Sequence, residues 1–161
     1  MVVELFAETT LADRLARIEA ELDAIEISAY ARQPVDQARH NASALRRLES
    51  RLATHVGAAV RAADALMPGR NSAQMFARDF GNDSRSAHRE LRQAEMLAEA
   101  NLTESAAAAG QISHKHATVI GHALKELPAD VTLEQRHFAE KALIRDAARY
   151  SPADLATRGR R

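Results

Sequence analysis

The most constraining feature of the sequence is the helical spacing of its apolar residues, which dominates the chain while strand-like alternation is scarce. Near the N-terminus, five large apolar residues follow one another at spacings of 4, 3, 4 and 3: Leu11, Leu15, Ile18, Leu22 and Ile25. This spacing places them in one narrow seam on a long first helix, which Pro34 interrupts. The periodicity therefore predicts an all-α fold.

A second long helix is expected to follow Pro34 and to end near Met67-Pro68-Gly69, because proline and glycine together stop a helix. Its apolar positions are Leu45, Leu48, Leu52, Val56, Val60 and Ala63. We expect residues 1–69 to form an antiparallel hairpin about 30 to 40 Å long. A two-chain coiled coil or a swapped dimer remains an alternative, so this hairpin is a candidate dimerisation arm for a homodimer.

The composition favours a compact multi-helix domain over residues 70–161. Hydrophobic residues make up 46% of the chain but aromatic residues only 4%, so the helices are expected to pack closely through small aliphatic side chains. The net charge of zero hides an asymmetry. Residues 1–30 carry seven acids and two bases, whereas residues 141–161 carry six bases and two acids, which predicts a basic C-terminal end.

The absence of cysteine excludes disulfides, thiolate zinc sites and cysteine nucleophiles. The sequence contains no long apolar run, so we expect no membrane span and no signal peptide, and a cytoplasmic location.

The stretch RDFGNDSRSAHRELRQAEML, residues 78–97, indicates two helices joined by a turn. We expect a short helix over 73–80, a turn at Gly81-Asn82-Asp83 and a longer helix from about Ser84 to Ala98, with Asp83 or Ser84 as its N-cap. At about 100° per residue, the longer helix has an apolar face and, nearly opposite, a basic face. The apolar face comprises Ala87, Leu91, Ala94 and Ala98, and the basic face comprises Arg85, Arg89 and Arg92.

This arrangement over residues 72–98 is what a helix-turn-helix requires of its recognition helix. Arginine can pair with guanine, and serine can contact bases or phosphate. The candidate DNA-binding residues are Ser84, Arg85, Ser86, His88, Arg89 and Arg92. An ordinary solvated helix face would look similar, since Glu90, Glu95 and Glu99 dilute the positive charge, so the pattern alone leaves both readings open.

Further along, Gly110 is expected to end one short helix and Ser113 to cap the next. The motif Gly110-Gln-Ile-Ser-His-Lys-His116-Ala, then Leu124, Leu127-Pro128 and ARYSPADLA at 148–156, resembles the helical domain of unknown function (DUF) 222. This actinobacterial family includes the mycobacterial thirteen-E-twelve repeat proteins and is often followed by an HNH endonuclease domain. The resemblance covers most of the chain, most strongly from Ser72 to Ala156.

The segment is also similar, more distantly, to the helix-turn-helix of ParB-type partition proteins. Their recognition helix starts with Ser-Arg-Ser, and a Gly-x-Leu-Ser-x-x-His-Ala turn follows. Together these resemblances imply double-stranded DNA as the partner. They also imply a structural role for His116, with its ring at the start of a helix and a ring nitrogen bonded to nearby backbone.

The sequence offers no candidate catalytic, metal or cofactor residues. An HNH nuclease needs a ββα-metal site, and the chain reaches Arg161 before any such region, so we expect a non-enzymatic module that could be the N-terminal part of a nuclease. His40-Asn41 is interpreted as a polar surface pair. His114 and His116 should point to different helix faces, which disfavours a metal site.

Overall fold

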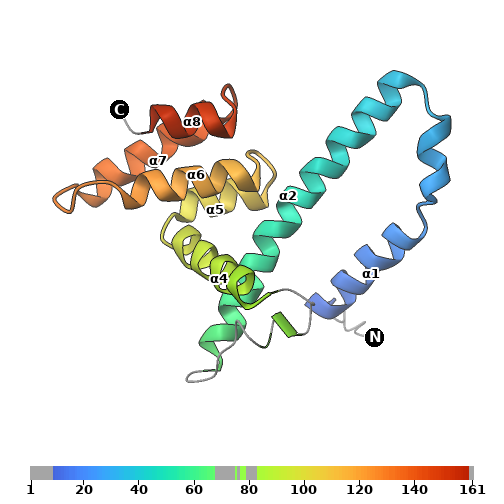
Figure 1. Cartoon of the computed structure of the whole chain (residues 1–161), viewed down its shortest axis with the longest axis horizontal. Helices are drawn as coiled ribbons and strands as arrows, with labels where there is room; N and C mark the ends of the chain where they lie inside the picture. The colour runs from blue at the N-terminus through green and yellow to red at the C-terminus, as the bar shows by residue number, and fades with distance from the viewer. Residues whose placement is uncertain (1–8, 68–74, 76, 79–82, 160–161) are drawn as a thin grey trace, which may run out of the picture. The chain divides into compact units, whose positions relative to one another are not determined.

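A computed structural model describes residues 9–67, 75, 77–78 and 83–159, and every regular element in these ranges is a helix (Figure 1), which confirms the all-α prediction. The elements are α1 (Leu11–Asp23), the 3₁₀ helix η1 (Ile27–Arg32), α2 (Val35–Ala65), α4 (Ser84–Ala98), α5 (Asn101–Ala108), α6 (His114–Lys125), α7 (Leu133–Ala147) and α8 (Pro152–Arg158).

The chain divides into two compact units, Met1–Ser43 and Ala44–Arg161, so the division falls within α2. From Ala44 onward, α2 belongs to the same unit as α4 to α8. The antiparallel hairpin over 1–69, and a domain boundary near residue 69, stay predictions.

In the first unit, α1 begins with a capping box at Thr10 and Asp13. The Thr10 N–H donates to the Asp13 carboxylate (2.9 Å), and the Asp13 N–H donates to the Thr10 hydroxyl (3.1 Å). The helix ends at Asp23, so Ile25 lies beyond it, and η1 occupies part of the segment up to Pro34 that was expected to be one long helix. At its end the Ala24 N–H donates to the Ala20 carbonyl (3.1 Å) and the Ile25 N–H to the Leu22 carbonyl (3.1 Å), so the last turn tightens to 3₁₀-type bonding before the chain leaves the helix.

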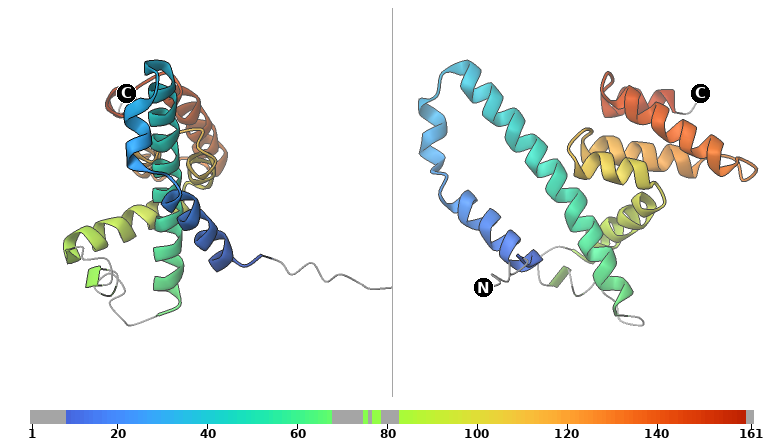
Figure 2. Two further views of the ribbon diagram at one scale, coloured as in Figure 1. Left: turned by 90° about the vertical axis from the view of Figure 1, so that its right-hand side faces the viewer. Right: turned by 180° about the vertical axis from the view of Figure 1, so that it is seen from behind.

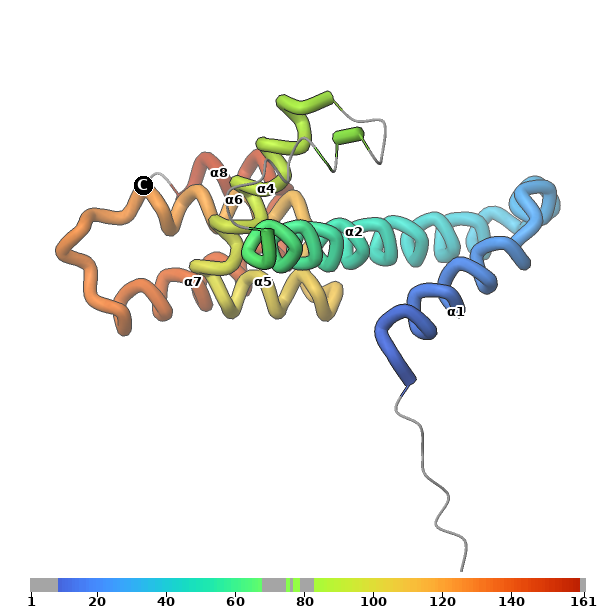
Figure 3. The backbone as a smooth tube through the Cα atoms, turned by 90° about the horizontal axis from the view of Figure 1, so that it is seen from below, coloured from blue at the N-terminus to red at the C-terminus, as the bar shows by residue number. Residues whose placement is uncertain are grey.

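The core of the second unit surrounds α6, which packs against α4, α5, α7 and α8. Figures 2 and 3 show these helices from three further directions. The buried core residues are Leu97, Ala100, Ala106, Ala107, Ile112, Ala117, Ile120, Leu124, Ala147 and Leu155. Half of these are alanines, which fits the prediction of closely packed helices with few aromatic side chains.

The connection from α5 to α6 follows the predicted pattern of a glycine stop and a serine cap. Gly110 has a left-handed φ of 75°, and the next N–H, that of Gln111, donates to the Ala106 carbonyl (2.9 Å) in a Schellman-type ending. The Ser113 hydroxyl then caps α6 by accepting the His116 N–H (3.2 Å).

Within the second unit, α2 docks on the bundle through small and polar residues. A Cβ added at Gly57 would lie 3.4 Å from Ala94 Cβ, which shows how closely α2 approaches α4. Arg61 donates to the Ala94 carbonyl (2.8 Å) and pairs with Glu104 (3.0 Å). The apolar positions noted in the sequence behave differently: Val60 is buried, but Leu45, Leu48, Leu52 and Val56 are exposed.

Candidate functional site

The N-terminal end of α4 is organised by Asp83. Its carboxylate accepts the Ser86 N–H (2.9 Å) and the Ser86 hydroxyl (2.8 Å), so Asp83 is the N-cap of a helix with the predicted bounds. The backbone bond from Ser86, followed by the hydroxyl bond, holds the pKa of the Asp83 carboxyl below its usual value. The first turn of α4 is therefore fixed by its own side chains.

All six predicted DNA-binding residues lie on the first turns of α4. Arg85, Arg89 and Arg92 are exposed, as their shared face predicts. Arg89 also donates to the Ser86 hydroxyl (3.1 Å), which draws the guanidinium toward the helix start. The Nδ1 of His88 lies 2.7 Å from the Ser84 carbonyl, so this nitrogen is used within the helix and only the other edge of the ring is left for a partner.

The opposite face of α4 packs into the bundle. Ala87 and Ala94 are buried, while Leu91 and Ala98 are partly buried, as the periodicity predicts. Leu97 is also buried and belongs to the core, although the periodicity did not assign it to the apolar face.

The basic face ends at Arg92, the last of the three arginines assigned to it from the sequence. Met96 lies on the same side of the helix as the arginines, yet it is buried against α6. A Cβ added at Gly121 would lie 2.8 Å from the Met96 methyl carbon. The sequence signal for this burial is an apolar residue, Met96, on the side of the helix that carries the arginines. Only the part of this face that carries the arginines remains exposed.

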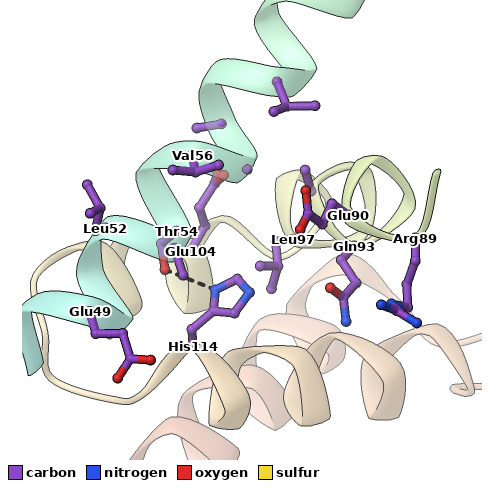
Figure 4. Close-up of a pocket in the computed structure, with 15 residues that line it drawn as sticks. Glu49, Leu52, Thr54, Val56, Arg89, Glu90, Gln93, Leu97, Glu104 and His114 are labelled. Atoms are coloured by element: carbon purple, nitrogen blue, oxygen red, sulfur yellow. Dashed lines mark hydrogen bonds between the residues drawn. The ribbon is translucent and has the colours of Figure 1, made fainter. Parts of the chain in front are cut away.

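A cavity of about 480 Å³ adjoins the basic face, between α2, α4 and the starts of α5 and α6 (Figure 4). Its wall carries both signs of charge, from Arg89, Glu90, Glu49 and Glu104, beside the apolar side chains of Leu52, Val56 and Leu97. This mixture does not resemble the uniformly basic surface that follows a nucleic-acid backbone.

His114 links α6 to α2 at this cavity. Its Nδ1 lies 3.2 Å from the Thr54 hydroxyl, as Figure 4 shows, and its backbone N–H donates to the Ser50 hydroxyl. Burial lowers the pKa of His114 below its ordinary value, because the partly buried ring is poorly solvated when charged. The bonds of His114 to Thr54 and Ser50 thus support the docking of α2.

His116 takes the structural role that the resemblance implies. Its Nε2 lies 2.9 Å from the Tyr150 carbonyl and its Nδ1 lies 2.8 Å from the Ser113 hydroxyl. Since a carbonyl can only accept, Nε2 carries the proton and Nδ1 is left to accept from Ser113. This ring fastens the start of α6 to the segment before α8, on a different face from His114, as predicted.

The other candidate positions give no further site. His40 is exposed on α2, and the side chain of Asn41 bonds to Gln33 (2.9 Å) and Gln37 (3.1 Å), consistent with a polar surface pair. Among the residues that the structure describes, no three His, Cys, Asp or Glu side chains come together where they could hold a metal ion. None of the described helices combines the length and apolar character needed to cross a lipid bilayer.

The predicted first helix of the helix-turn-helix, 73–80, and the turn at Gly81-Asn82 lie largely outside the described residues. Ala77 is described, and it is buried together with Ala87 of α4. The helix-turn-helix itself therefore stays a prediction, whereas the bounds and the exposed face of α4 are established.

Comparison with known proteins gives one result. A family model described as "Domain of unknown function (DUF222)" matches residues 32–161, which include α2 and all of the helices that follow it. Searches of curated proteins and of solved structures found no match.

Proposed function

The chain belongs to the DUF222 family, and from this membership and the exposed start of α4 we propose that it is a non-catalytic module that binds double-stranded DNA. The observation that carries the proposal is the common exposed face of Arg85, Arg89 and Arg92, on a helix whose opposite face is held in the bundle. A recognition helix needs both features, since a loose helix could not present its side chains in a fixed register.

In this proposal the arginines, more than the helix end, provide the contacts to DNA. The positive end of α4 is already occupied by the Asp83 carboxylate, which would repel a phosphate placed there. Arg85 and Arg89 can instead pair with guanine or phosphate, and a good bidentate contact to a base gives about 1–3 kcal/mol of discrimination. Ser84 and His88 lie at the edge of the same surface.

The resemblances noted in the sequence support DNA over other anionic partners. Association with HNH endonuclease domains, and the ParB-like order of the Ser-Arg-Ser and Gly-x-Ile-Ser-x-x-His-Ala motifs, both favour a DNA-related role. In the basic C-terminal end, the Arg158 guanidinium lies over the Tyr150 ring, 4.2 Å from its centroid. From there its charge can add a nonspecific contact to the DNA backbone. Arg78, which is exposed, would act similarly. Arg70, Arg160 and Arg161 are further candidates for such contacts and lie outside the described residues.

Fluorescence anisotropy with a labelled DNA duplex tests this function. We expect the full chain to bind at about 50 mM salt, and Arg85→Ala plus Arg89→Ala to weaken binding at least about tenfold, because each lost contact is worth 1 kcal/mol or more. A wild-type chain that binds no duplex at this salt concentration would reject the proposal.

A second candidate function is a self-association scaffold, which one feature of the first unit favours. The seam of α1 is exposed within that unit, from 47% at Leu15 to 72% at Leu11, and no described residue of the unit is buried. Several exposed apolar residues in a row favour an interaction surface. Multi-angle light scattering separates the candidates, since a stable dimer that ignores DNA favours the scaffold and a strict monomer that binds DNA rejects it.

A further inference from the structure

The hydrogen bonds at the start of α4 limit what each polar side chain there can offer to a partner. The Ser86 hydroxyl donates to the Asp83 carboxylate (2.8 Å) and accepts from the Arg89 guanidinium (3.1 Å). A hydroxyl has one proton, so Ser86 cannot donate to DNA while it is bonded to Asp83. Ser86 therefore positions Arg89 instead of donating to a base.

The ring of His88 is held by a carbonyl at the start of its own helix. Its Nδ1 lies 2.7 Å from the Ser84 carbonyl oxygen and 3.4 Å from the Ser84 hydroxyl. Because a carbonyl oxygen can only accept, Nδ1 carries a proton. In the uncharged ring the second nitrogen, Nε2, then lacks a proton and is an acceptor. No residue that the structure describes bonds to Nε2, so this acceptor is left for a partner.

His88 lies in one row with two of the arginines. At about 100° per residue, Arg85, His88 and Arg92 fall within an arc of about 60°, at spacings of three and four residues. Arg85 and Arg92 are exposed, and the His88 ring between them is partly buried. A guanidinium has donors and no acceptor, so the row offers one ring acceptor between two groups of donors.

The base edges in the major groove of DNA contain the matching groups. Guanine presents two acceptors, N7 and O6, to an arginine, whereas adenine and cytosine present an amino group that donates. Each base pair carries one such amino group, at a place that differs among the four pairs, so an acceptor at a fixed position distinguishes them. Phosphate oxygens only accept and cannot bond to Nε2 of the uncharged ring.

We propose that His88 is a specificity-determining residue of the DNA surface, and that its Nε2 accepts a hydrogen bond from the amino group of an adenine or a cytosine. This inference rests on the DNA binding proposed above and specifies which chemical group of the bases the surface selects. The arginines on either side then supply the contacts to guanine or phosphate.

Selection of duplexes from a random pool is the first step of the test, because it requires no known target. Wild type, His88→Ala and Ser84→Ala are each used at pH 8, at which histidine side chains are ordinarily uncharged. Ser84→Ala is the matched control, since it removes the neighbouring hydroxyl and keeps the carbonyl that holds the His88 ring. We expect wild type and Ser84→Ala to share a base preference at one position where His88→Ala has lost it.

The second step changes the DNA, so its result with wild type does not depend on the folding of a variant. In the duplex selected by wild type, the amino-bearing base at that position is replaced by its counterpart without the amino group, which is purine for adenine or 2-pyrimidinone for cytosine. We expect the affinity of wild type to fall about three- to tenfold, the usual effect of one hydrogen bond. The substitution also weakens base pairing, and the smaller fall expected with His88→Ala measures that part.

Identical base preferences in wild type and His88→Ala would overturn the inference while leaving DNA binding intact. Equal falls in affinity of the two proteins on removal of the amino group would overturn it as well. A wild-type chain that binds no duplex would overturn both the inference and the function on which it rests.

Discussion

At the scale of single residues, the most consequential side chain outside the proposed interface is Glu140 of α7. It is 2% exposed, and its carboxylate accepts the backbone N–H (2.7 Å) and the hydroxyl (2.8 Å) of Thr103 in the first turn of α5. The N-cap of α5 is Ala100, which has no side-chain acceptor. Glu140 therefore caps α5 from a neighbouring helix and ties α7 to it.

Replacing Glu140 with alanine should destabilise the second unit by about 2 kcal/mol or more, because two buried donors on Thr103 would lose their acceptor. Glu140→Gln keeps a carbonyl acceptor in the same place and should cost less. Urea unfolding followed by circular dichroism measures both variants, and equal stability of Glu140→Ala and wild type would show that the cap is not needed.

His114 should make stability depend on pH. Because burial lowers its pKa in the folded chain, the unfolded chain binds the proton more readily. Stability is then highest above the unfolded value of about 6.5 and falls as the pH drops below it. We expect the urea midpoint to fall between pH 7.5 and pH 5.5, and to fall less in His114→Gln. An equal fall in both proteins would exclude His114 as a source of the effect.

At the scale of elements, Gly110 sets the angle between α5 and α6. Its left-handed backbone suits glycine, and any other residue in this conformation is strained. Gly110→Ala should therefore cost about 1–2 kcal/mol of stability from backbone strain, and more because a Cβ there would lie 2.9 Å from Arg51 Cδ. Chemical denaturation that shows equal stability of Gly110→Ala and wild type would contradict this explanation.

The elements also show what the sequence could predict. Helix caps and glycine stops act locally, so Asp83, Gly110 and Ser113 could be identified from the sequence, and they predicted the bounds of α4 and the start of α6. The docking of α2 could not be predicted in this way. Arg51 and Arg61 donate to the Ala108 and Ala94 carbonyls, and backbone acceptors leave no pattern in side-chain sequence. Likewise, the burial of Met96 depends on a helix that is distant in the sequence.

At the scale of the whole molecule, the two proposals use different surfaces. DNA binding uses the start of α4, whereas the proposed self-association uses the exposed seam of α1. We therefore expect Leu15→Glu plus Ile18→Glu to leave the affinity for a short duplex with one site nearly unchanged. On a longer duplex with two sites, the same variant should lose the additional affinity that two associated chains gain by binding together. Anisotropy on short and long duplexes checks this. An equal loss on both lengths would show that α1 contributes to the DNA surface itself.

The most direct test of the central claim is the dependence of duplex affinity on salt in three proteins: wild type, Arg85→Ala plus Arg89→Ala, and Arg39→Ala plus Arg47→Ala. The last pair removes the same charge from exposed positions on α2, outside both the proposed DNA surface and the basic C-terminal end. Each phosphate contact contributes about 0.9 to the slope of log affinity against log salt. For the α4 variant alone, the account predicts weaker binding and a slope whose magnitude is lower by about one to two. Equal losses in the two variants would contradict it.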